Sequence, residues 1–255
     1  MNRYNTESTD ALRYTENTSV NLRISVPSVL NIVILFSFIL FSFSSKAQEL
    51  SYVTFSGATD LSSLSFKTDD GVIIKISDDG RILEYGPEME KWRYNYFPGK
   101  LQQFLGRVDY YGATYDSVMR GKISVIGSVA ITYYGATEKN EKRGKIRTIG
   151  RIMLDYYDNF DNQVLRGKLR SAGSLNFNYY SSYDDNAYKG KLRSVGTNTI
   201  TYYSSFDDRL IRGKVKTIGN MSFSWYDAHD PTGYQGGMKS GNLISMINGV
   251  TYILM

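Results

Sequence analysis

Apolar and polar positions alternate along much of the second half of the chain. In residues 191–206 the two parities hold different residues: Leu192, Ser194, Ile200, Tyr202 and Phe206 on one, and Lys191, Arg193, Thr199, Thr201 and Tyr203 on the other. A period of two is typical of β-strands, because successive side chains point to opposite sides of the pleat. The pattern therefore predicts strands with an apolar, aromatic face and a basic, hydroxyl-rich face.

This stretch is one copy of a repeat with a period of 23 residues. Glycines, tyrosine pairs and Gly-Lys pairs recur in step; the glycines are Gly127, Gly150, Gly173, Gly196 and Gly219, and the lysines are Lys122, Lys145, Lys168, Lys191 and Lys214. Columns that stay in step over several periods indicate one supersecondary unit per period.

Parity within a unit limits the connections between strands. For Leu192 and Tyr202 to share a face, the turn at Gly196–Asn198 needs an odd number of residues, and the turn at Asp208-Arg209 then needs an even one. We expect an all-β fold, an antiparallel meander of tandem two-strand repeats. The alternatives are a parallel β-solenoid, in which equivalent lysines would stack and repel one another, and a closed β-barrel.

Hairpin signals flank the repeats. Asp78-Asp79-Gly80 separates two apolar runs near the start, and Asn248-Gly249 separates two more near the end. We expect residues 48–98 to form an N-terminal β-hairpin region, and residues 99–255 to form the array, closed by the C-terminal hairpin as a cap. Because the stability of an array is a sum over neighbouring units, deletion of one unit is expected to leave a folded, shortened protein.

The N-terminal segment reads as an export signal. The apolar run Leu30–Phe43 is shorter than the ~20 residues of a membrane-spanning helix. Ser45-Lys46-Ala47 follows, with small residues at the −3 and −1 positions of a signal-peptidase site. We expect residues 1–47 to be a signal peptide with an extended n-region, which an early start codon would explain, and an uncleaved anchor is the alternative. The expected location is the periplasm, the cell surface or the extracellular space.

The amino-acid composition excludes several classes of metal and catalytic site. The chain has no cysteine, which excludes zinc-thiolate sites and thiol catalysis, and its one histidine cannot form a histidine-rich metal site. His229 shares a column with Phe160, Tyr183 and Phe206, so a packing position at a strand end is expected. The net charge of +5 is modest and is not gathered in a basic tail. We expect no catalytic residue, no metal and no cofactor, and therefore no enzyme.

Acidic residues recur once per unit, as Asp161-Asn162, Asp184-Asp185 and Asp207-Asp208. Aspartate is a preferred turn residue, and a turn is needed in every unit, whereas an active site is needed once. Calcium binding and glycoside cleavage by paired carboxylates are the alternatives. The Gly-Lys pairs lack the spacing of a phosphate loop, so their glycines are expected to relieve crowding or to permit a strand bulge.

The basic face is the candidate binding surface. In the predicted register Tyr203 lies between Lys191 and Lys214, which favours cation–π pairs on an exposed face. The candidate binding residues are Lys145, Lys168, Lys191, Lys214, Tyr157, Tyr180 and Tyr203. An envelope glycan or protein fits such a face. Single-stranded nucleic acid would also stack on it, but export argues against that partner. The alternative is a solvated face that binds nothing.

Residues 179–193, YYSSYDDNAYKGKLR, resemble the MORN repeat in their order of aromatic pair, turn and Gly-Lys. The likeness covers roughly residues 99–241, without the second glycine-rich half of the MORN pattern. It implies an interaction or scaffolding module and no particular ligand. We expect an exported structural or binding repeat protein of the cell envelope. A transmembrane β-barrel of an outer membrane is the alternative, and a glycan-active hydrolase is a third. Membrane contact is expected only for a barrel or an uncleaved anchor.

Overall fold

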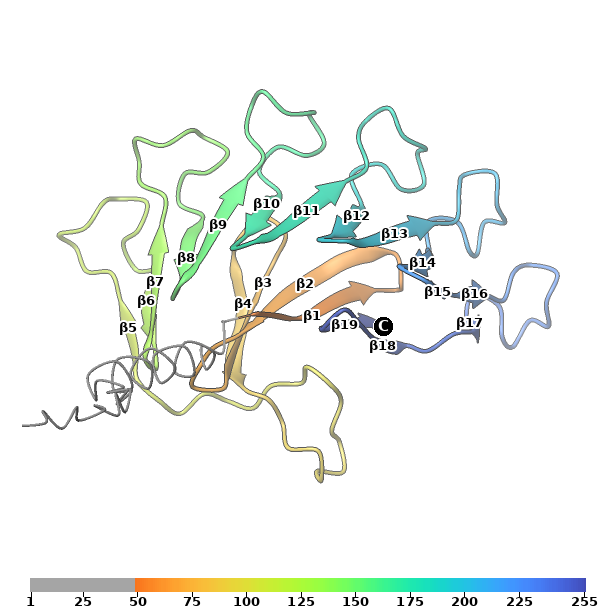
Figure 1. The fold of residues 1–255 in the computed structure, drawn as a ribbon, viewed down its shortest axis with the longest axis horizontal. Helices are drawn as coiled ribbons and strands as arrows, with labels where there is room; N and C mark the ends of the chain where they lie inside the picture. Colours follow the sequence, from red (N-terminus) through yellow and green to blue (C-terminus); the bar gives the residue numbers. More distant parts are fainter. Residues whose placement is uncertain (1–48) are drawn as a thin grey trace, which may run out of the picture. The chain divides into compact units, whose positions relative to one another are not determined.

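The structure is a computed structural model that describes residues 49–255. Within this range all regular structure is β, in nineteen strands (Figure 1). No helix with the length and apolar character needed to cross a bilayer occurs among these residues. The expected signal peptide, residues 1–47, lies outside the described range, so its assignment stays a prediction.

The repeats form an open sheet of eleven strands that follow one another in chain order, and each pairs antiparallel with the next. This confirms the predicted antiparallel meander, and the parallel arrangement is wrong. The strands are β5 (Val108–Tyr110), β6 (Ile123–Ile126), β7 (Val129–Tyr133), β8 (Ile146–Ile149), β9 (Ile152–Tyr156), β10 (Leu169–Ala172), β11 (Leu175–Tyr179), β12 (Leu192–Val195), β13 (Asn198–Tyr202), β14 (Val215–Ile218) and β15 (Met221–Ser222). A two-stranded sheet of β16 (Ser224–Trp225) and β17 (Met238–Ser240) follows.

Two kinds of connection alternate along the array. At one end, tight turns of two residues join the strands; at Gly196-Thr197 the flanking residues Val195 and Asn198 pair directly, and Gly196 has a φ of 55°. At the other end, loops of twelve residues project, such as 203–214 between β13 and β14 (Figure 1). The predicted three-residue turn at Gly196–Asn198 and two-residue turn at Asp208-Arg209 are both wrong.

The reason is a β-bulge in the first strand of each repeat. Tyr179 pairs with Leu192 and Asn178 pairs with Ser194, so Arg193 has no partner across the strand. An extra residue reverses the parity of the strand beyond it. Leu192 and Val195, three positions apart, are consequently both buried. The expected strict alternation, with Ser194 on the apolar face, fails at this point.

The remaining strands form a six-stranded sheet in the order β18-β19-β1-β2-β3-β4. Their bounds are β1 (Glu49–Ser56), β2 (Asp60–Lys67), β3 (Val72–Ile76), β4 (Ile82–Pro87), β18 (Ile244–Ile247) and β19 (Val250–Leu254). Both predicted hairpins are present, β3–β4 and β18–β19. The second does not extend the array as a cap, because β19 pairs in parallel with β1 and so joins the N-terminal sheet.

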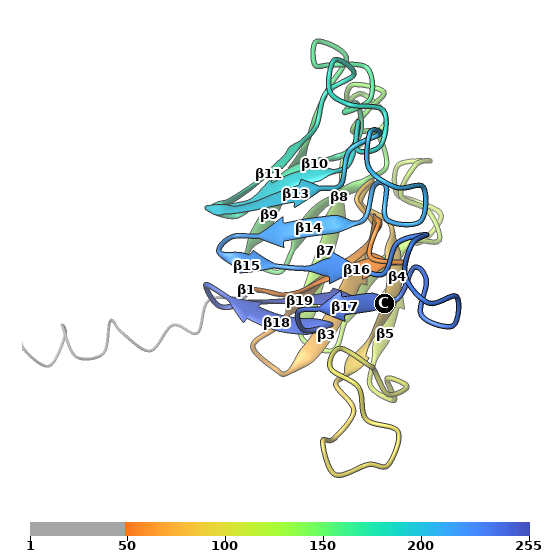
Figure 2. The ribbon, with the colours of Figure 1, turned by 90° about the vertical axis from the view of Figure 1, so that its right-hand side faces the viewer.

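The two sheets enclose one core. The eleven-stranded sheet, green to blue, arches over the six-stranded sheet (Figures 1 and 2). Buried side chains from both belong to one hydrophobic cluster, among them Phe66 and Ile74 below and Ile131, Tyr156 and Ile200 above. The apolar face of the repeats is therefore covered by the chain's own terminal strands.

Candidate functional site

The lysines of the Gly-Lys pairs lie on the core side of the array. Each ammonium group sits over the ring of the first aromatic residue of the next pair, which is buried: Lys145 over Tyr156 at 5.3 Å, Lys168 over Tyr179 at 5.2 Å, Lys191 over Tyr202 at 5.5 Å and Lys214 over Trp225 at 4.6 Å. The predicted register, with Tyr203 between Lys191 and Lys214 on an exposed face, is wrong. Lys191 is the last residue of the twelve-residue loop before β12, so the strict alternation of a strand does not extend to it.

These ammonium groups hold neighbouring repeats together. The Nζ of Lys145 donates to the carbonyl oxygen of Gly167 at 2.7 Å, and that of Lys191 donates to Gly213 at 3.0 Å. The glycines that accept these bonds have φ values of 78° and 73°, a region that favours glycine. Burial lowers the pKa of both lysines, since desolvation disfavours the ammonium form.

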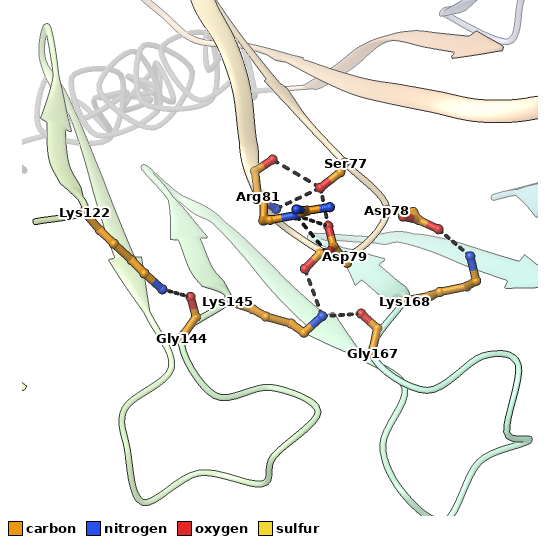
Figure 3. Close-up of polar contacts among 9 residues, drawn as sticks. All are labelled: Ser77, Asp78, Asp79, Arg81, Lys122, Gly144, Lys145, Gly167 and Lys168. Carbon is orange, nitrogen blue, oxygen red and sulfur yellow. Dashed lines mark hydrogen bonds and ion pairs between the residues drawn. The ribbon is translucent and has the colours of Figure 1, made fainter. Parts of the chain in front are cut away.

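The same lysines also anchor the six-stranded sheet (Figure 3). Lys145 donates to the backbone oxygen of Asp79 at 3.0 Å, and Lys168 forms an ion pair with Asp78; both acids lie in the β3–β4 turn. Lys191 lies 3.5 Å from the carboxylate of Asp60 at the start of β2. The candidate binding lysines thus already have partners inside the molecule.

The second tyrosine of each pair is half-buried and forms a hydrogen bond to the next repeat. The hydroxyl groups donate to carbonyl oxygens twenty residues further on: Tyr157 to Phe177 at 2.9 Å, Tyr180 to Ile200 at 2.9 Å and Tyr203 to Phe223 at 3.1 Å. Burial raises the pKa of all three hydroxyls. The rings lie beside a different set of cations from the one predicted, namely Arg170, Arg193 and Lys216. The seven candidate residues therefore do not form one exposed surface.

The acidic residues build the twelve-residue loops. The carboxylate of Asp184 accepts from the backbone N–H of Ser181 at 2.5 Å and from its hydroxyl at 2.8 Å. Asp185 accepts from the N–H of Ala187 at 2.7 Å and from the hydroxyl of Ser205, on the next loop, at 2.7 Å. These bonds confirm the turn role. No group of three or more His, Cys, Asp or Glu side chains suited to a metal ion occurs in residues 49–255.

What the loops leave exposed is an aromatic ring at one repeated position. The side chains at this position stand 85% exposed for Phe160, 93% for Tyr183, 95% for Phe206 and 90% for His229. We call these four residues the ring row. The predicted packing position for this column is wrong, because it lies in a long loop and not at a strand end.

The loops that carry the ring row have fixed internal geometry. The backbone N–H of Gly213 donates to the carbonyl of Tyr203 at 2.9 Å and closes the base of its loop. Arg212 donates to the carbonyl of Asp207 at 3.3 Å, and Asp207 directly follows Phe206 in the sequence. Because the polar groups hold the loop, the ring of Phe206 is not needed for the loop's own structure and stands exposed. An aromatic residue beside an Asp turn, repeated every 23 positions, is the sequence signal that could have identified it.

Comparison of the chain with models of protein families, with curated proteins and with solved structures finds no match. The likeness of the repeat to MORN therefore stays a prediction.

Proposed function

We propose that this chain is an exported repeat protein of the cell envelope with a structural or binding role, and that the ring row is its interaction surface. The observation that carries the proposal is the repetition: Phe160, Tyr183 and Phe206 occupy the same position in successive loops, and each is at least 85% exposed. Isolated exposed rings are ordinary on protein surfaces, whereas an aligned set is typical of a contact surface.

A partner that contacts successive loops in the same way must itself consist of repeating units. Equivalent positions of adjacent units are two strand spacings apart in the sheet, about 10 Å. The loops diverge outward from the sheet (Figure 1), so the units of the partner have to be spaced more widely than that. An envelope glycan has such a repeat, and a flat aromatic ring can pack on the apolar face of a sugar. The three loops that carry Phe160, Tyr183 and Phe206 also combine acids and bases in similar numbers, so no strong charge selects the partner. A glycan polymer is therefore favoured over a compact protein epitope.

Fractionation tests the compartment. The processed protein is expected in the envelope or the medium, with Gln48 as its first residue. Recovery of the unprocessed chain in the cytosol would contradict the export that the proposal needs.

Substitution of the rings tests the surface. A Phe160→Ala, Tyr183→Ala, Phe206→Ala variant is expected to lose about tenfold in retention on envelope glycan freed of protein by protease, since several weak contacts act together. Met153→Ala is the matched control, because Met153 is also exposed, at 58%, but lies on β9. Equal retention of the triple variant and the unaltered protein would refute the ring row.

A further inference from the structure

The connection between β4 and β5 carries a second set of exposed aromatic side chains. Trp92 is 77% exposed and Tyr94 is 107% exposed, and the exposed cations Lys91 and Arg93 alternate with them. The guanidinium of Arg93 lies 5.4 Å from the centre of the Trp92 ring. Tryptophan is on average a highly buried residue, so an exposed Trp flanked by cations indicates a contact surface.

The base of this connection is fixed while its tip stands free. Glu88 accepts a hydrogen bond from the hydroxyl of Tyr52 at 2.6 Å and another from the N–H of Gly99 at 3.0 Å. Leu101 is buried and pairs with Glu88 across the base. The tip, drawn in yellow, extends away from both sheets and from the loops of the array (Figures 1 and 2). Trp92 and Tyr94 are therefore held where a flat partner can reach them.

A groove of about 610 Å³ lies at the base of the same connection. Leu83, Phe97, Pro98 and Ile253 supply apolar walls, and Lys100 also lines the groove. An ion pair between Lys75 and Glu84, 2.7 Å apart, adds charged groups to the lining. The groove thus offers both apolar and charged contacts to one ligand.

We propose that Trp92, Tyr94, Lys91 and Arg93 dock this protein on a lipid bilayer with anionic headgroups, and that the groove receives part of a lipid molecule. Trp and Tyr concentrate at the bilayer interface because their rings are apolar and their N–H or O–H groups are polar. Lys and Arg are attracted to anionic lipid surfaces. This surface is separate from the ring row and involves neither a spanning strand nor the N-terminal apolar run.

Quenching of tryptophan fluorescence tests the proposal. The full chain is mixed with vesicles of phosphatidylcholine carrying brominated acyl chains, with or without phosphatidylglycerol. Bromine quenches a tryptophan that enters the bilayer, and Trp225 is buried, at 6% exposed, so quenching reports on Trp92. We expect quenching by the phosphatidylglycerol vesicles that weakens as salt is added. Trp92→Phe should remove it.

Two variants separate this docking from other modes of binding. Lys91→Glu combined with Arg93→Glu is expected to weaken quenching by about tenfold at low salt, and Phe206→Ala, the matched exposed-ring control, is expected to leave it unchanged. If the chain sediments with vesicles but Trp92 is not quenched, the N-terminal run alone holds it there and the proposal is wrong. Undiminished quenching in the charge-reversal variant also overturns it, and so does an absence of quenching with every vesicle.

Discussion

Tyr180 shows how one side chain joins two repeats. Its ring is half-buried, and its hydroxyl donates to the carbonyl of Ile200 at 2.9 Å. Tyr180→Phe removes the donor and leaves a buried acceptor, which is expected to lower the free energy of unfolding by about 0.5–1.5 kcal/mol. Tyr183→Phe is the control in the same loop, because Tyr183 is 93% exposed. Denaturant titration of both variants measures the difference, and equal midpoints would contradict the role of the hydroxyl.

Alanine substitutions at three glycines separate the effect of backbone strain from the effect of steric crowding. Gly213 has a φ of 73°, and a Cβ there would lie 2.8 Å from the carbonyl oxygen of Ala187. Gly121 has a φ of 74° with open space around it, and Gly112 has neither constraint. Gly112→Ala is expected to leave the free energy of unfolding unchanged. Gly121→Ala is expected to lower it by about 1–2 kcal/mol, because alanine is unfavourable in the left-handed region. Gly213→Ala should lower the free energy of unfolding further, because strain and crowding act together there. Thermal unfolding of the three variants checks this order.

At the scale of the element, the twelve-residue loops depend on ionised carboxylates. Backbone N–H donation from Ala187 holds the pKa of Asp185 below its usual 3.8, and donation from Ala136 does the same for Asp116. A lowered pKa in the folded state means that the stabilisation is complete above pH 3.8 and is lost as the pH falls through the lowered value. Asp185→Asn is expected to lose less stability than the unaltered protein between about pH 5 and pH 2. Urea midpoints measured across that pH range test this prediction. Parallel plots of midpoint against pH for the two proteins would contradict a stabilising role of the hydrogen bonds to Asp185.

The strands could be predicted from sequence, but their connections could not. Alternation around Ile200 and Tyr202 indicated the strand that is now β13. A strict period of two hides the bulge at Arg193, because it places Leu192, Ser194 and Tyr202 on one face. An apolar pair three positions apart just before a glycine was the available signal. The same strict period places the lysines on the exposed face and Phe206 on the apolar face, and both placements are wrong.

At the scale of the whole molecule, the array is covered by a sheet that contains strands from both ends of the described chain. β1 pairs in parallel with β19, with Val53 opposite Tyr252. A pairing between residues about 200 positions apart has no local signature, since turn chemistry reports only on neighbours in sequence. The sequence therefore indicated the β18–β19 hairpin without indicating the sheet that it joins.

This covering sheet changes the expected effect of deleting one repeat. In the isolated array expected from sequence, a deletion shortens the protein and leaves it folded. In the observed fold the six-stranded sheet contacts fixed positions in different repeats: Asp78 meets Lys168, the carbonyl of Ala58 accepts from the N–H of Val215, and Ser128 bonds to Asp70. Deletion of residues 181–203 would shift Val215 by one whole unit relative to Lys168, so these contacts could not all form.

We therefore expect the deletion variant to unfold at a clearly lower temperature and over a broader range than the unaltered protein, because contacts between the sheets and not only between neighbouring repeats are lost. Replacement of residues 181–203 by a second copy of residues 204–226 is the matched control, since it preserves the number of units and their spacing. Calorimetry distinguishes the two: a deletion variant with the sharp transition and midpoint of the replacement variant would show that the repeats are independent of the sheet they cover.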